Sequence, residues 1–394
     1  MMELVRLELG LWIEINCGGL VKSLFLLLLF YAAGYAQEVD IIGQVAVSTD
    51  VLNDPAAGHS GINHVVGYIP TLSYYPRYEW AKGFDFEVAY KVQSQFDGLF
   101  GTGDIGSDTN GDFHRLWGRY SSDRVEFRYG LQKISFGPGL ILRPLMWFDT
   151  LNQKDPTGQT DGVTAVRLRY YGKSDITYWG WVIHPEDSDL RAPGGRVEFS
   201  LAKLGNFGAS YHHRPKYSST VVPDNSGFAL VGPTSAEDRY GIDFRTDKVI
   251  GFWAEATVAR SSKHDFVFPI DRDIFMIGGD YTLPLGNGVY VLTEFMVDKV
   301  KPKLLSDDEQ IELSAFLINY PINMLDSGSL IIEYDWENRR YFNFLRFSRT
   351  YDNYIFNLLL FSNPERDEFS TEEIEFAGLT GFGKGMQLMA IYNH

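Results

Sequence analysis

Charged side chains recur at every second position in several stretches of this 394-residue chain. Arg167 and Arg169 alternate with apolar residues in one stretch, and Glu333 and Asp335 do so in another. Alternation of this kind places the charges on one face of a β-strand and the apolar residues on the other. A charged face in contact with water can orient dipolar solutes and select among ions.

The candidates for lining a water-filled interior are the charged residues on the polar face of each predicted strand. They are Asp85, Glu87, Arg115, Arg119, Arg128, Arg167, Arg169, Glu294, Glu312, Glu333 and Asp335. The arginines come from three consecutive predicted strands and could form a basic wall, with the acids of the later strands opposite. The alternative is that these charges pair within each wall and only make the interior soluble.

A catalytic interpretation has little support. Ser210 and His212 share a strand face, but the sequence offers no carboxylate or amide partner for a hydrolase triad. His212 and His213 point to opposite faces of a strand, so the pair cannot hold one metal ion. A single cysteine excludes zinc ribbons and disulfide scaffolds. We therefore expect no enzyme activity, no metal site and no cofactor.

Composition narrows the class further. The chain has 35 Lys+Arg against 51 Asp+Glu, a net charge of −16, and 45% hydrophobic residues. That much apolar surface favours a folded chain over a disordered one. The acidic excess argues against nucleic acid as a partner, because binding phosphates requires a basic face.

Residues 1–36 have the layout of a secretory signal peptide. Lys22 precedes the short apolar run 23–31, and small residues follow at Gly34 and Ala36. The alternative, a membrane-anchor helix, needs roughly 20 apolar residues, more than this run provides. We predict export of a mature chain of residues 37–394.

The mature chain reads as strands and turns. Clear period-two alternation occurs in 84–93, 125–132 and 330–337, and many of the turn signals between the segments are of hairpin length. Short turns alternate with longer polar connections, which is how transmembrane barrels are wired. The sequence therefore predicts an all-β fold: a transmembrane, antiparallel, up-and-down β-barrel of about 16 to 18 strands.

A soluble all-β domain is the alternative fold. It is disfavoured because full charges stand in the middle of strands, where a buried sheet face could not hold them. Aromatic residues also gather at strand ends, as at Tyr178, Trp179 and Trp181. Such residues form girdles at membrane–water interfaces. We predict the outer membrane of a Gram-negative bacterium, with lipid and lipopolysaccharide as neighbours.

Residues 137–161 differ from the other connections. They contain a Gly-Pro-Gly breaker, two aromatic residues and several charges. Folded into the lumen, this segment could narrow a pore; the alternative is an ordinary external loop. The candidate constriction residues are Arg143, Asp149, Lys154, Asp155 and Asp161.

This part of the chain resembles a known family. The block 128–137 is followed by a Trp-containing loop and by a strand that opens with Asp-Gly. It resembles outer-membrane porins of the alginate-export type, in which a Gly-Arg-Gln strand ending in aromatic-Gly precedes an Asp-Gly strand. The matching residues are Gly130, Gln132, Phe136, Gly137, Asp161, Gly162 and Arg167, while Leu131 stands where the family usually has arginine. The resemblance implies a barrel that passes solutes across the outer membrane.

The sequence thus predicts a porin for passive diffusion of small hydrophilic or charged solutes. A monomer and a homotrimer both stay open. An alternative function is a barrel with a closed lumen that binds or assembles surface polysaccharide. A barrel hydrolase is the third, and it would depend on His212.

Overall fold

The computed structural model describes residues 39–54, 61–76, 78–98, 106–151, 155–173, 175–184, 191–202, 204–215, 236–261, 270–302, 309–365 and 383–394. The predicted signal peptide, residues 1–36, lies outside these ranges. No helix within them is long and apolar enough to cross a membrane.

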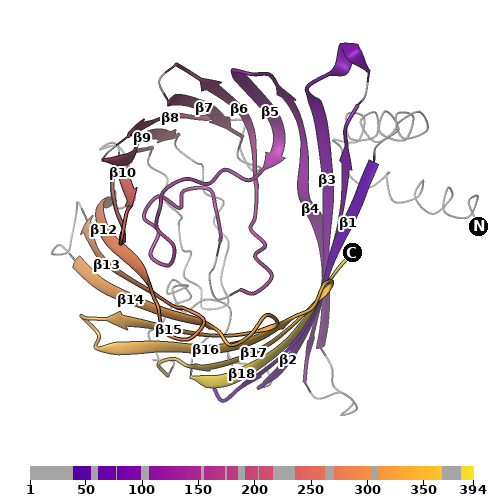
Figure 1. The fold of residues 1–394 in the computed structure, drawn as a ribbon, viewed down its shortest axis with the longest axis vertical. Helices are drawn as coiled ribbons and strands as arrows, with labels where there is room; N and C mark the ends of the chain where they lie inside the picture. Colours follow the sequence, from indigo (N-terminus) through magenta and orange to yellow (C-terminus); the bar gives the residue numbers. More distant parts are fainter. Residues whose placement is uncertain are drawn as a thin grey trace, which may run out of the picture.

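The chain forms one closed antiparallel sheet of 18 strands, as predicted, and Figure 1 shows it as a ring. Each strand pairs with the next along the chain, and β1 pairs with β18 to close the barrel. The strands are β1 (Val39–Leu52), β2 (Ile62–Tyr74), β3 (Phe84–Asp97), β4 (Gly106–Ser121), β5 (Val125–Gln132), β6 (Val163–Tyr171), β7 (Ile176–Ile183), β8 (Ala192–Leu201), β9 (Gly205–Arg214), β10 (Glu237–Asp247), β11 (Gly251–Ser261), β12 (Ile270–Leu283), β13 (Val289–Pro302), β14 (Glu309–Pro321), β15 (Asp326–Asp335), β16 (Arg340–Thr350), β17 (Tyr354–Ser362) and β18 (Lys384–Asn393), and the single-turn 3-10 helix η2 (Glu79–Ala81) precedes β3.

Turn chemistry sets one rim of the barrel. Short connections at 122–124, 248–250, 284–288 and 351–353 all lie at this rim. In the turn 284–288, Gly286 and Gly288 have φ of 56° and 95°, which glycine adopts without strain. The Asn287 side chain between them donates to the carbonyls of Pro321 and Ile322, at 3.0 and 2.9 Å. The sequence therefore holds neighbouring turns together at this rim.

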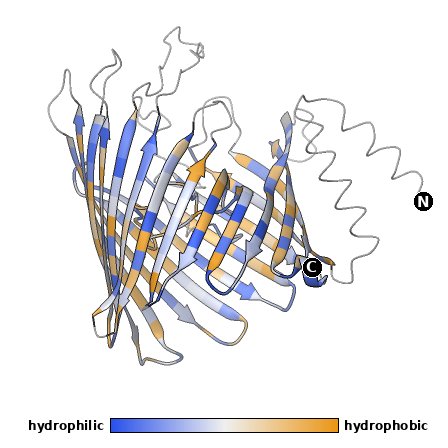
Figure 2. Cartoon of the chain, turned by 90° about the horizontal axis from the view of Figure 1, so that it is seen from above, coloured by the Kyte–Doolittle hydropathy of each residue, from blue (hydrophilic) through white to orange (hydrophobic). Residues whose placement is uncertain are grey.

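The two faces of the sheet have different environments. Figure 2 shows hydrophilic and hydrophobic residues alternating along the strands. Large apolar side chains such as Leu168, Phe275 and Phe316 are exposed on the outside. Polar side chains of the other face line a cavity inside the barrel. This is the arrangement of a barrel with lipid outside and water inside.

Part of the inner face is apolar, and the reason is the long connection between β5 and β6. This connection contains residues 137–161, which we call the lumen segment. Its described parts, 137–151 and 155–161, lie inside the ring in Figure 1. Its Leu140, Ile141 and Leu142 pack on Trp253, Met276, Leu292, Met296 and Ala315 of β11 to β14. The barrel therefore has a hydrophobic core on its inside, where the lumen segment covers the wall.

Candidate functional site

The lumen segment begins at a position that requires glycine. Gly137 has a φ of +91°. A Cβ there would lie 2.6 Å from Oε1 of Glu255 and 2.9 Å from Cβ of Leu145. Because glycine alone tolerates both the dihedral angle and the close approach, the chain can turn inward here.

Two buried carboxylates hold the first part of the lumen segment. Glu255 on β11 accepts the backbone N–H groups of Gly139 and Leu145, at 2.6 and 3.0 Å. Glu294 on β13 accepts those of residues 140, 141 and 142, at 2.8, 2.9 and 2.6 Å. It also accepts the indole N–H of Trp253 at 3.0 Å. Backbone groups of a buried loop need such partners, and these side chains provide them.

Aromatic packing fixes the next part. Trp147 and Phe148 lie against Phe136, Trp181 of β7 and His212 of β9, with ring centroids 4.8 Å apart for Phe148 and His212 and 5.4 Å apart for Phe136 and Trp147. The Trp181 indole N–H donates to Nδ1 of His212 at 3.3 Å. His212 therefore helps to seat the lumen segment.

Ser210 is also engaged in structural contacts. Its hydroxyl accepts a hydrogen bond from Arg196 at 2.8 Å. Arg196 in turn bonds Asp243 at 2.6 Å. Within the described ranges, no group of three or more His, Cys, Asp and Glu residues is placed to hold a metal ion. These contacts give the proposed hydrolase pair a structural role.

A buried ion pair joins two residues of the lumen segment. Arg143 lies 3.0 Å from Asp149, and both side chains are buried, at 7% and 1% exposed. Burial alone would raise the pKa of Asp149, but hydrogen bonds from Ser135 and Arg143 outweigh it and hold this pKa below its usual value of 3.8. Asp149 is thus charged at neutral pH.

We expect Asp149→Asn to loosen the lumen segment, because it leaves Arg143 buried without a counter-charge, at a cost of about 3–5 kcal/mol. Since the pKa of Asp149 is lowered by folding, its contribution is present above pH 3.8 and is lost as the pH falls through the folded-state pKa. Limited proteolysis of the segment in detergent measures this. The wild type should stay protected down to about pH 4, whereas Asp149→Asn should be cleaved at neutral pH. Asp155→Asn is the control, and equal protection of Asp149→Asn would contradict the prediction.

The far end of the lumen segment contacts the opposite side of the barrel. Gln159 donates to the side chain of Gln44 on β1 at 2.9 Å, and Gln44 donates to the carbonyl of Thr157 at 3.4 Å. Arg115 on β4 donates to the carbonyl of Thr160 at 2.6 Å. The segment therefore crosses the interior from β11 and β13 to β1 and β4.

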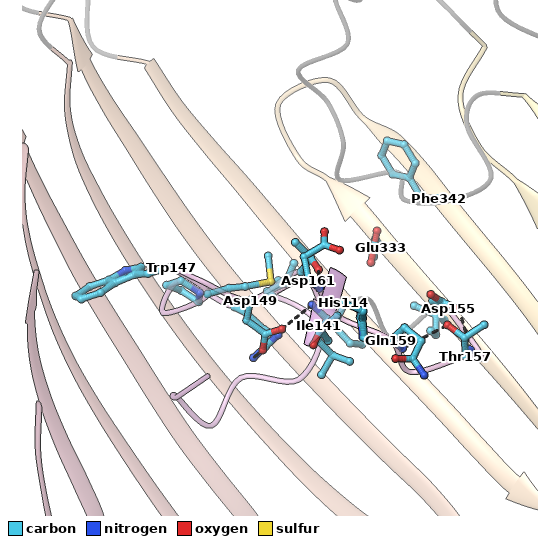
Figure 3. A pocket seen from close by; sticks show the side chains of 18 of the residues that line it. His114, Ile141, Trp147, Asp149, Asp155, Thr157, Gln159, Asp161, Glu333 and Phe342 are labelled. Atoms are coloured by element: carbon cyan, nitrogen blue, oxygen red, sulfur yellow. Dashed lines mark hydrogen bonds and ion pairs between the residues drawn. The ribbon is translucent and has the colours of Figure 1, made fainter. Parts of the chain in front are cut away.

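A cavity of about 1340 Å³ lies beside the lumen segment, and Figure 3 shows part of its lining. Of the candidate constriction residues, Arg143, Asp149, Asp155 and Asp161 all line it. Asp155 also accepts the backbone N–H of Thr157 at 2.8 Å. Lys154 lies outside the described residues.

The candidate arginines lie together, and nearby carboxylates offset their positive charge. Register pairs Arg119 with Arg128, and Arg128 with Arg167. Between them, Glu126 lies 2.7 Å from Arg167, 3.5 Å from Arg119 and 3.8 Å from Arg128. Asp85 binds Arg119 at 2.7 Å. Glu126 was not predicted from the sequence as a residue of this wall, although its spacing of two residues from Arg128 places both side chains on the same face of β5.

Two of the remaining candidates on this side interact with tryptophan. Arg169 lies over the Trp179 ring, 3.4 Å from its centroid. Glu87 accepts the indole N–H of Trp117 at 3.0 Å. The ion pairs above fit the alternative in which the charges pair within the wall, while Arg169 and Glu87 are held by aromatic side chains.

The four candidate acids do not form one wall. Glu333 lines the cavity, whereas Glu294 is sealed behind the lumen segment. Asp335 accepts the backbone N–H groups of Glu337 and Asn338, at 3.0 and 3.1 Å, in the turn before β16. Its side chain stabilises that turn, which lies at the rim opposite the turn 284–288.

Glu312 lies on the outer face, in contrast to the expectation. It pairs in register with Val297, and these two residues alternate with Leu313 and Met296, which line the cavity. Phe316, on the same face as Glu312, is 38% exposed. The prediction assumed that the apolar residues of β14 face lipid, but they face the lumen segment, so the polar residues of this strand lie on the outer face.

A second charged wall was not anticipated. On β9 and β10, Glu237 binds Arg214 at 3.3 Å and Arg239 at 2.5 Å, and all three line the cavity. Arg272 on β12 also lines the cavity and forms an ion pair with Asp298. These residues lie near the longer connections, where alternation is read less clearly from sequence.

Comparison with models of known families and with curated proteins gave no match. Solved structures do match. OccD3 (OpdP) of Pseudomonas aeruginosa has a TM-score of 0.54 and 8% identity, with 91% of each chain covered. OccAB1 of Acinetobacter baumannii has a TM-score of 0.52 and 9% identity, covering 91% of this chain and 96% of that one.

An anion-selective porin from Comamonas acidovorans has a TM-score of 0.46 and 12% identity, with 91% of this chain and 99% of that one covered. At 8–9% identity the likeness to the two Occ structures concerns the fold. The chain has the closed antiparallel barrel fold that these outer-membrane proteins share.

Proposed function

We propose that this barrel is a passive channel whose lumen is narrowed by residues 137–161. The observation that carries the proposal is the path of the lumen segment. It crosses the interior between Glu294 and Gln44, fixed by hydrogen bonds at both ends, beside a cavity whose lining includes many charged and amide side chains. Small hydrophilic or charged solutes would diffuse past it down their gradient.

The charge distribution supports passage with modest selectivity. Among the described residues of the inner face, Arg119, Arg167 and Arg239 each have a carboxylate partner, at 2.7, 2.7 and 2.5 Å. Compensated charges keep the lumen hydrated without holding a permeant ion tightly, and conduction requires such weak binding. The size of the solute relative to the lumen, and the net charge around Arg239 and Arg272, would then decide which solutes pass.

Current across a planar lipid bilayer that contains the refolded mature chain tests the proposal. We expect stable conductance steps, and the reversal potential in a salt gradient would give the ion preference. A fully folded protein without conductance would overturn the channel and favour the alternative, a closed barrel that binds or assembles surface polysaccharide. Pull-down with polysaccharide would then be the next measurement.

The resemblance to alginate-export porins extends the proposal to anionic oligosaccharides. Two features limit this extension: Leu131 replaces the usual arginine, and Glu126 compensates Arg128 and Arg167. Oligouronates added to the bilayer should block the current if the extension holds. An absence of block, with the channel still conducting, would remove it.

A homotrimer also stays a prediction, which the mass of the detergent-solubilised protein tests.

A further inference from the structure

The cavity has one wall of a different character. On β18, β1, β2 and β3, six of the thirteen residues that line it are uncharged amides or hydroxyls and five are apolar, with only Asp50 and Lys91 charged. We call this the neutral wall; its polar uncharged residues are Gln44, Ser48, Asn63, Gln93, Gln95 and Gln387. The arginines of β9, β10 and β12 lie on other strands of the barrel.

Register orders the neutral wall into rows. Asp50 pairs with Asn63 on one side and with Gln387 on the other. In the next row, Ser48 lies between Val65 and Met389, and Val65 pairs with Gln95. Successive rows are about 7 Å apart, because inward side chains occur at every second residue. Hydrogen-bonding groups and apolar patches therefore alternate over a short distance.

Several acceptors of the neutral wall are buried yet unused. Among the described residues, Oδ1 of Asp50, Oδ1 of Asn63 and Oε1 of Gln387 have no hydrogen-bond partner. Gln387 is only 4% exposed and Ser48 only 6%. Buried polar atoms normally find partners. These three atoms are closed off from a solute, whereas the amides of Gln93 and Gln95 line the cavity and are half-buried and exposed, respectively, so they can exchange hydrogen bonds with it.

We infer that the neutral wall is a weak binding track for neutral polyhydroxylated solutes, that is, sugars and polyols. Each amide offers both donors and acceptors, which suits a hydroxyl group that does both. Val65 and Met389 can contact the C–H faces of a sugar ring. This inference rests on the proposed channel function and names the class of solute that it favours.

The test uses the conducting barrel with sucrose as the probe and a polyethylene glycol of similar size as the comparison. Sucrose should lower the open-channel current in a saturable way, while the glycol polymer should lower it without saturation. Conductance with no saturable effect of sucrose would overturn the inference and leave the channel function intact. No conductance at all would overturn both.

A double variant assigns the effect to the neutral wall. Gln93 and Gln95 on β3 line the cavity, so Gln93→Leu with Gln95→Leu removes two amides at similar volume. The apparent Kd for sucrose should rise about tenfold, with the conductance in salt alone nearly unchanged. Thr257→Val, which removes a cavity hydroxyl from β11, is the control and should bind sucrose as the wild type does. Equal effects of the two variants would contradict the assignment.

Discussion

Deletion of residues 145–158 is expected to raise the single-channel conductance severalfold. These residues include Trp147 and Phe148, which fill the space beside β7 and β9, and Asp149 and Asp155, which line the cavity. Without them the lumen would be limited only by the barrel wall and by the remaining residues of the lumen segment, which lie against that wall. Conductance follows the narrowest cross-section of a water-filled pore, so opening that section has a large effect.

Folding of the deletion variant must be established in parallel. Heat-dependent migration on a gel and the β-sheet signal in circular dichroism report the closed barrel. The barrel itself should survive, because the hydrogen-bonded ladders of the 18 strands do not pass through the deleted residues. Unchanged conductance of a folded variant would rule out the lumen segment as the constriction.

Glu294→Gln is expected to release the lumen segment, although the two side chains have nearly the same shape. All four groups that contact the Glu294 carboxylate are donors: the N–H groups of residues 140, 141 and 142, and the indole of Trp253. A glutamine keeps one acceptor oxygen and presents an NH₂ group to the remaining donors. Each buried donor left without an acceptor costs about 1–3 kcal/mol, so docking of the segment should weaken by several kcal/mol.

Proteolysis within the lumen segment and excess current noise measure this release. Glu312→Gln is the matched control, because that carboxylate lies on the outer face and does not touch the segment. The control should behave as the wild type. If Glu294→Gln were as protected and as quiet as Glu312→Gln, the proposed anchoring role of Glu294 would be wrong.

Much of the barrel follows from local alternation. The stretch 125–132 was predicted as a strand and forms β5 (Val125–Gln132), and the turn at Asn287 lies where its flanking glycines predict one. Alternation succeeds because each of these strands has one face toward lipid and the other toward water. The face on which most strand residues lie can therefore be predicted from the residues next to them in sequence.

Alternation fails where a distant part of the chain changes the environment. Leu313 and Ala315 face inward because Leu140 and Ile141 of the lumen segment lie over that wall. Because neighbouring residues alternate between the two faces, the inward position of Leu313 and Ala315 places Glu312 on the outer face. The sequence of β14 by itself does not show which of its faces is the inner one. Likewise, nothing near Glu255 in sequence indicates that it accepts hydrogen bonds from residues 139 and 145.

The pairing of β1 with β18 also bears on the order of folding. Gln44 and Asn393, 349 positions apart, form a side-chain hydrogen bond across this seam. Contacts between such remote residues form slowly, since the loop-closure entropy must be overcome first. Gln44 is also the residue that receives the far end of the lumen segment. Docking of that end needs β1 and β4, and the bond to Asn393 on β18 completes the position of Gln44, so we expect the passage to take its final shape late in assembly.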